Sequence, residues 1–128
     1  MNYLLDTHIL LWAIQNHPKL SKKAKDIILN PDNELFFSTV SVWEIAIKYS
    51  VQKPNGFIDP ANFYDLLKRN QYRELTVNSH HAIAVKALPF FHKDPFDRML
   101  IAQANHENLI LMTVDDKIMH YDGQIIMV

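Results

Sequence analysis

Four carboxylate residues occupy positions from which they could act together: Asp6, Glu44, Asp97 and Asp115. Two of them follow short apolar runs, and the other two fall near the starts of helical patterns. Like charges that lie close together are costly unless a cation neutralises them, and carboxylate oxygens are the ligands that Mg²⁺ and Mn²⁺ prefer. The pattern therefore indicates a site that holds divalent cations and activates water for hydrolysis.

The elements that must position these acids alternate between short apolar strands and helical patterns. This alternation predicts an α/β fold of three layers, α/β/α, around a mostly parallel central sheet. Strands are predicted at residues 2–6, 34–38, 73–77, 109–113 and 124–128. Helices are predicted at about 8–15, 21–29, 41–49, 62–70, 79–87 and 95–106, with a break at Pro54, Gly56 and Pro60.

The predicted topology brings the four acids to one edge of the sheet. In right-handed crossovers each strand ends at the edge where the following helix begins. Open α/β sheets bind their ligands at this carboxyl edge. We therefore expect Asp6, Glu44, Asp97 and Asp115 to converge there.

Structural explanations remain open for the two acids in helices. Ser41, three residues before Glu44, makes a capping-box pattern, and Lys48, four residues after it, could form an ion pair with it. Asp97 at the third position of its helix would interact favourably with the helix dipole even without a ligand.

The other acids also have alternatives. Asp6 could cap the following helix, and Asp115 could be a turn residue. Asp94 directly precedes Pro95, a position that favours a helix cap over a metal ligand. An acid such as Asp6 that closes an apolar strand must nevertheless find a partner or stay hydrated.

Length and composition favour one globular domain over residues 1–128. The hydrophobic fraction of 48% and the charged fraction of 21% exclude a largely disordered chain. Cysteine is absent, which excludes disulfides, thiolate zinc sites and cysteine nucleophiles. No signal segment or membrane helix is recognisable, so a cytoplasmic location is expected. The net charge of −1 argues against a general DNA-coating protein.

Four motifs are spread along essentially the whole chain: Tyr3-Leu-Leu-Asp-Thr-His8, Ser41-Val-Trp-Glu-Ile-Ala-Ile-Lys48, His92-Lys-Asp-Pro-Phe-Asp-Arg-Met-Leu-Ile-Ala-Gln-Ala104 and Met112-Thr-Val-Asp115. With these motifs the sequence resembles PIN-domain nucleases. More narrowly, it resembles the VapC toxins of bacterial and archaeal toxin–antitoxin pairs.

The resemblance implies a PIN-like fold, an endoribonuclease activity and dependence on Mg²⁺, with Mn²⁺ able to substitute. It implies that Asp6, Glu44 and Asp97 form the acidic triad of the family, with Asp115 as a weaker fourth acid. Whether one or two metal ions bind is not readable from the sequence. RNA as substrate also follows from the resemblance alone.

Three residues beside the acids are candidates for contacts with the substrate: Thr7, Arg98 and Thr113. Each could touch a phosphate or orient a ligand. Capping and exposure to solvent remain the alternative explanation for Thr7 and Arg98, and Thr113 enters through the resemblance as a hydroxyl near the acids.

The resemblance further implies a homodimer and a small cognate antitoxin. We expect the protein partner to bind an apolar surface near Trp12, Trp43 and the predicted helix at 62–70. An aromatic content of 11% is more than one small core is expected to bury completely.

Other functions fit the sequence less well. Only two glycines are present, Gly56 and Gly123, which excludes glycine-rich dinucleotide and phosphate-binding loops. A phosphoacceptor signalling domain would want an acceptor aspartate on a middle strand and a lysine after a late strand, whereas two of the predicted strands end in Ser38 and Thr113. A catalytically idle binding module and a housekeeping PIN nuclease without an antitoxin remain alternatives.

Overall fold

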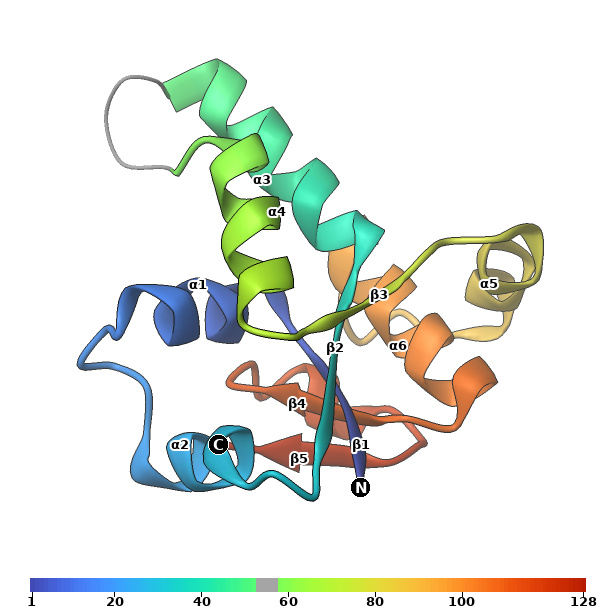
Figure 1. The fold of residues 1–128 in the computed structure, drawn as a ribbon. Helices are drawn as coiled ribbons and strands as arrows, with labels where there is room; N and C mark the ends of the chain where they lie inside the picture. The colour runs from blue at the N-terminus through green and yellow to red at the C-terminus, as the bar shows by residue number, and fades with distance from the viewer. Residues whose placement is uncertain (53–57) are drawn as a thin grey trace.

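The computed structural model describes residues 1–52 and 58–128 and has a sheet of five parallel strands at its centre (Figure 1). The strands, in the spatial order β3-β2-β1-β4-β5, are β1 (Asn2–Leu5), β2 (Glu34–Ser38), β3 (Arg73–Leu75), β4 (Ile110–Thr113) and β5 (Ile125–Met127). The described residues also form six α-helices: α1 (Thr7–Gln15), α2 (Lys22–Leu29), α3 (Thr39–Gln52), α4 (Pro60–Arg69), α5 (Ser79–Ala84) and α6 (Pro95–Glu107). The predicted α/β fold is confirmed, and every strand pair in it is parallel.

Successive residues of the central strands enter two different cores. Tyr3 and Leu5 pack into one core with side chains of α1, α2 and α4, whereas Leu4 packs into the other with side chains of α6. Successive side chains of a strand point to opposite faces of a sheet, so both faces of β1 are covered. This arrangement explains the uninterrupted apolar run at the start of the chain, and it gives the three predicted layers.

The strand register places the residues that follow β1 and β4 next to each other. Leu5 pairs with Met112, and the amide of Asp6 donates a hydrogen bond of 3.0 Å to the Met112 carbonyl. Asp6 and Thr113 therefore meet at the carboxyl edge of the sheet, as the crossover argument predicts.

Helix α3 begins at Thr39, earlier than the predicted start at Ser41. The reason is local: Ser38 Oγ accepts a hydrogen bond of 3.0 Å from the Val40 amide, so the chain turns into the helix directly after β2. Glu44 consequently lies more than one turn inside α3. The capping-box explanation for Ser41 and Glu44 is therefore wrong.

The boundaries of α6 and α5 can be compared with the predicted helices. Asp94 caps α6 with Pro95 at its start, as predicted, and Asn108 ends that helix in the left-handed region. The predicted helix at 79–87 is α5 continued by a 3₁₀ turn, η1 (Val85–Ala87). The predicted break at Pro54 and Gly56 lies outside the described residues. Within the described ranges, no helix combines the length and hydropathy needed to cross a membrane.

Candidate metal-binding active site

The four predicted acids line one small cavity at the carboxyl edge of the sheet. Its volume is about 170 Å³, and the titratable side chains around it are Asp6, His8, Glu44, Lys48, His92, Asp94, Asp97 and Asp115. Asp6 follows β1, Glu44 comes from α3, Asp97 from the first turn of α6, and Asp115 follows β4. The convergence expected from the crossovers is therefore present.

Asp6 is 4% exposed, and both of its carboxylate oxygens are held by the protein. Oδ1 accepts the Ile9 amide at 3.0 Å, so the residue caps α1, and Oδ2 accepts the hydroxyl of Thr113 at 2.6 Å. Burial raises the pKa of Asp6, although these hydrogen bonds oppose the rise. Asp6 is thus both the cap suggested by the sequence and a member of the acidic cluster.

Thr113 is fully buried beneath the cavity. Its Oγ1 accepts the Asp115 amide at 3.0 Å while it donates to Asp6, so the hydroxyl links two of the acids. A side chain without exposed surface cannot reach RNA in this conformation. We propose that Thr113 positions Asp6 in place of the substrate contact expected from the sequence.

Glu44 is oriented by two side chains. Lys48 Nζ lies 2.7 Å from Glu44 Oε2, which confirms the ion pair predicted from the spacing of four residues. Thr7 Oγ1 lies 2.8 Å from Glu44 Oε1 and also 2.8 Å from Ser41 Oγ. Thr7 is buried and its hydroxyl donates to the Glu44 carboxylate, so we propose that Thr7 also has a positioning role.

Asp97 shows the electrostatic character of the cluster most clearly. Burial, together with the carboxylates of Asp94, Asp6 and Glu44, raises the pKa of Asp97 to about 7, and His92 alone among the named neighbours opposes the rise. About half of the Asp97 side chains are therefore protonated near pH 7, and a cation in the cavity would favour the ionised form.

His92 is the residue of the site that sequence reasoning missed. Its Nδ1 accepts the Asp94 amide at 3.2 Å, so in the neutral ring the proton resides on Nε2. Nε2 lies 2.9 Å from Asp97 Oδ2 and 2.7 Å from Asp115 Oδ2 and can donate to both. The available signal was the position of His92 in the loop just before the Asp94 cap.

Asp115 lies at the mouth of the cavity, with 32% of its side chain exposed. Burial acts to raise its pKa, but hydrogen bonds from the Lys117 amide at 2.9 Å and from His92 outweigh burial and lower the pKa. Asp115 is therefore ionised across the neutral range, in contrast to Asp97.

The donor set fits a hard divalent cation. Four carboxylates supply oxygen ligands, and the tautomer of His92 makes it a hydrogen-bond donor to two of them. Carboxylate oxygens suit Mg²⁺ and Mn²⁺ better than softer metals. Asp94 lines the same cavity, but its Oδ1 accepts the Phe96 amide at 2.8 Å, so it serves mainly as the helix cap.

A family model described as the PIN domain matches residues 3–124. The chain belongs to the PIN-domain family. The resemblance of its motifs is thereby confirmed over nearly the whole sequence.

Solved structures with the same fold include VapBC proteins and FitAcB. One is VapBC2 from Rickettsia felis bound to a DNA fragment from their promoter, with a TM-score of 0.72, 16% identity and coverage of 100% of this chain and 99% of that chain. VapBC-5 from Mycobacterium tuberculosis, of the VapBC family of toxin–antitoxin systems, has a TM-score of 0.65 and 18% identity, and the match covers 99% of this chain and 98% of that chain. FitAcB from Neisseria gonorrhoeae has a TM-score of 0.66 and 14% identity, and the match covers 96% of this chain and 95% of that chain. No curated protein sequence matches the chain significantly.

In this PIN domain the guanidinium of Arg98 lies away from the acids. Arg98 is 5% exposed and donates to the carbonyls of Pro89 at 2.7 Å and of Val85 and Leu88 at 3.2 Å, with Tyr121 Oη at 3.3 Å. These partners fix the loop that carries His92. We propose a structural role for Arg98 in place of the expected substrate contact.

A second group of metal-type side chains in the PIN domain consists of His81, His106 and Glu107. His81 Nδ1 accepts the Asn78 amide at 3.1 Å as part of a helix cap, which leaves the proton on Nε2 to be donated to Glu107 at 2.7 Å. A ring nitrogen that carries a proton cannot bind a metal. We therefore interpret this group as a structural hydrogen bond between α5 and α6.

Proposed function

We propose that this PIN domain is a Mg²⁺-dependent endoribonuclease that hydrolyses RNA phosphodiester bonds, and that it is the toxin of a toxin–antitoxin pair. One observation carries the proposal: four carboxylates surround a single cavity, and burial and neighbouring acids raise the pKa of one of them, Asp97, to about 7. Such a cluster gains stability from a divalent cation. Mn²⁺ offers the same coordination chemistry and should substitute.

Asp6, Glu44, Asp97 and Asp115 would hold the metal in this proposal. A bound divalent cation activates water and offsets negative charge on a phosphodiester. The surrounding residues keep the carboxylates in place, since Thr113 holds Asp6 and Lys48 holds Glu44.

His92 completes this arrangement, because its Nε2–H faces the carboxylates of Asp97 and Asp115. It positions the two acids relative to each other. Lys48, with 36% of its side chain exposed, adds positive charge at the cavity, where an RNA phosphate must approach.

The proposed protein partner binds an apolar stripe on α3. Trp43, Ile47 and Val51 are spaced by four residues, so they share one face of the helix, and they are 59%, 39% and 76% exposed. Tyr64 of the neighbouring α4 is also 39% exposed. Trp12, which was also expected near this surface, is half-buried and stacks against His17.

We propose that this surface serves a homodimer and an antitoxin, which fits the complexes among the structural neighbours. Light scattering should give the mass of a dimer, and co-expression with the adjacent open reading frame should yield a stable complex. A monomer that captures no product of that frame would remove the toxin part of the proposal and leave a housekeeping nuclease.

The phosphoacceptor alternative is disfavoured by the state of Asp6. Both carboxylate oxygens of Asp6 accept internal hydrogen bonds, and its exposed fraction of 4% leaves little access for a phosphodonor. The RNA cleavage assay distinguishes a nuclease from a catalytically idle binding module.

The test is RNA cleavage by the purified protein with Mg²⁺, with Mn²⁺ and with excess chelator. We expect cleavage with either metal, none with chelator, and none for Asp97→Asn. Asp116→Asn is the matched control, because Asp116 is exposed beside Asp115 yet does not line the cavity, and it should cleave like the wild type. Undiminished cleavage in chelator would contradict the metal mechanism.

A further inference from the structure

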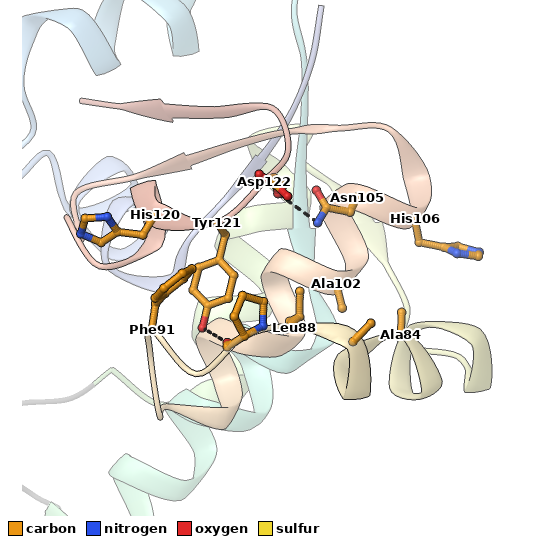
Figure 2. A pocket seen from close by; sticks show the side chains of 11 residues that line it. Ala84, Leu88, Phe91, Ala102, Asn105, His106, His120, Tyr121 and Asp122 are labelled. Carbon is orange, nitrogen blue, oxygen red and sulfur yellow. Dashed lines mark hydrogen bonds between the residues drawn. The ribbon is translucent and has the colours of Figure 1, made fainter.

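A second cavity, of about 580 Å³, lies between α5, η1, α6 and the segment that follows the 3₁₀ turn η2 (Ile118–His120) (Figure 2). Small side chains leave this space open: Ala84, Ala87 and Ala102 line it together with Leu88. Its volume lies within the range typical of small-molecule sites. The function proposed above does not use it.

Aromatic rings form one wall of this second cavity. Phe91 is 52% exposed, meets Tyr121 edge to face at a ring distance of 5.2 Å, and lies 5.8 Å from the ring of His120. Exposed aromatic side chains of this kind are the platforms on which unpaired nucleobases stack.

Polar groups stand at the rim opposite the apolar floor. Asn105 Nδ2 donates to the Asp122 carbonyl at 3.3 Å, and Asn105 Oδ1 packs against Gly123, where φ is +130° and any side chain would collide with this oxygen. The exposed carboxylate of Asp122 is thus the hydrogen-bond acceptor that the rim offers a ligand.

The second cavity is coupled to the acidic cluster through one loop. Phe91 lines the cavity, and the next residue, His92, contacts Asp97 and Asp115, so one loop borders both sites. Tyr121 Oη accepts the His92 amide at 2.9 Å, so the cavity wall also supports this loop. A nucleotide next to a phosphate at the acids would find the second cavity close by.

We propose that the second cavity binds one unpaired nucleobase of the RNA substrate next to the bond that is cleaved. This inference rests on the ribonuclease function proposed above and adds a determinant of base preference to it. The base stacks on Phe91, and its donor edge faces the carboxylate of Asp122. Because a carboxylate only accepts hydrogen bonds, cytosine, which has an exocyclic amino donor, binds better than uracil, which has a carbonyl there.

The test is an NMR titration of the full ¹⁵N-labelled chain with cytidine 5′-monophosphate (CMP) and uridine 5′-monophosphate (UMP) in excess chelator. We expect saturable shifts at Asn105 and Gly123, with tighter binding of CMP. Phe91→Ala should weaken CMP binding about tenfold, because stacking on an aromatic side chain contributes that much or more. Phe90→Ala is the matched control: Phe90 is 80% exposed and lies over Arg98 at 4.4 Å, outside this cavity, so CMP affinity should not change.

Ala102→Leu fills the cavity from its floor and should abolish the CMP shifts, with thermal melts to verify its fold. If it does not fold, Phe91→Ala still decides. Absence of saturable shifts at Asn105 and Gly123, equal binding of CMP and UMP, or unchanged binding by Phe91→Ala would each overturn the proposal. Binding is measured without metal, so CMP binding in a protein that cleaves no RNA would support the base site and refute only the ribonuclease proposal.

Discussion

Asp97 and Arg98 are neighbours on α6 and carry opposite charges, yet their surroundings differ completely. The Arg98 guanidinium is buried among backbone carbonyls that accept its hydrogens. The Asp97 carboxylate faces other carboxylates, and burial and those charges raise its pKa to about 7. The protein itself supplies the hydrogen-bond acceptors that stabilise the Arg98 charge. The Asp97 charge needs a bound cation for full stabilisation.

This difference separates two reasons for placing a charge inside a small protein. A buried charge with a full set of partners fixes a conformation, here that of the loop carrying His92. A partly buried charge among like charges reduces stability and is expected where a cation binds. Mutations can test this contrast between the hydrogen-bonded Arg98 guanidinium and the acidic cluster.

The largest effect is expected for Arg98→Met, which removes the hydrogen bonds and leaves several carbonyls unsatisfied. The free energy of unfolding should fall by about 3–5 kcal/mol without Mg²⁺, and by at least as much with Mg²⁺, because the loop that carries His92 loses its support. Urea denaturation measures it. Arg69→Met is the control, since Arg69 is exposed and forms an ion pair with Asp65, and it should cost less than about 1 kcal/mol. Near wild-type stability of Arg98→Met would contradict the structural role proposed for Arg98.

Thr113→Val comes next, and it tests the support beneath the acids. Valine has nearly the shape of threonine but cannot donate to Asp6 Oδ2, so the carboxylate loses its orientation. Mg²⁺ affinity and RNA cleavage should fall by about 10–100-fold, as is typical when a residue that supports a metal ligand is lost. Calorimetric Mg²⁺ titration and cleavage rates measure the two effects. A variant with unchanged metal affinity would show that Thr113 has no positioning role.

A smaller effect concerns pH in the absence of metal. The pKa of Asp97 is raised from 3.8 to about 7 by burial and by like charges, so the folded state holds its proton more tightly than the unfolded state. Stability should therefore fall as pH rises from about 4 to 7, by roughly 1–3 kcal/mol after allowance for solvent screening at this partly exposed group.

Asp115 works in the opposite direction, because its lowered pKa adds stability that is lost only as the pH falls below about 4. Denaturation of the metal-free protein at several pH values should separate the two. Asp97→Asn should show a smaller loss between pH 4 and 7, because the raised pKa of Asp6 contributes to the same loss. If the wild type were equally stable across that range, the electrostatic description of Asp97 would be wrong.

Sequence reasoning located the acids because their positions depend on topology. Asp6 and Asp115 follow parallel strands, and the start of α6 is marked by Asp94 and Pro95, so the shared edge could be derived without side-chain detail. The start of α3 was misplaced because the hydroxyl of Ser38, which fixes it, is not distinguished by hydrophobic spacing.

The roles of His92 and Arg98 could not be derived in the same way. Both depend on the path of an irregular loop, which places the His92 ring between two acids and wraps carbonyls around the guanidinium of Arg98. Charge and proximity to Asp97 in the sequence suggested a substrate contact for Arg98, yet side chains of successive helical residues point in different directions. Only the tertiary structure distinguishes the two environments.

The most direct test of the acidic cluster as a metal site compares thermal melts of the wild type and Asp97→Asn at pH 8, with and without Mg²⁺. Mg²⁺ at about 100 times its dissociation constant should stabilise the wild type by about 2.7 kcal/mol and the variant hardly at all.

Without Mg²⁺ the variant should be as stable as the wild type or slightly more stable. Relief of repulsion offsets the loss of about 0.3–1 kcal/mol of helix-dipole interaction. An Asp97→Asn protein that is less stable without metal, is still stabilised by Mg²⁺ and still cleaves RNA would contradict this assignment and make Asp97 a structural residue of α6.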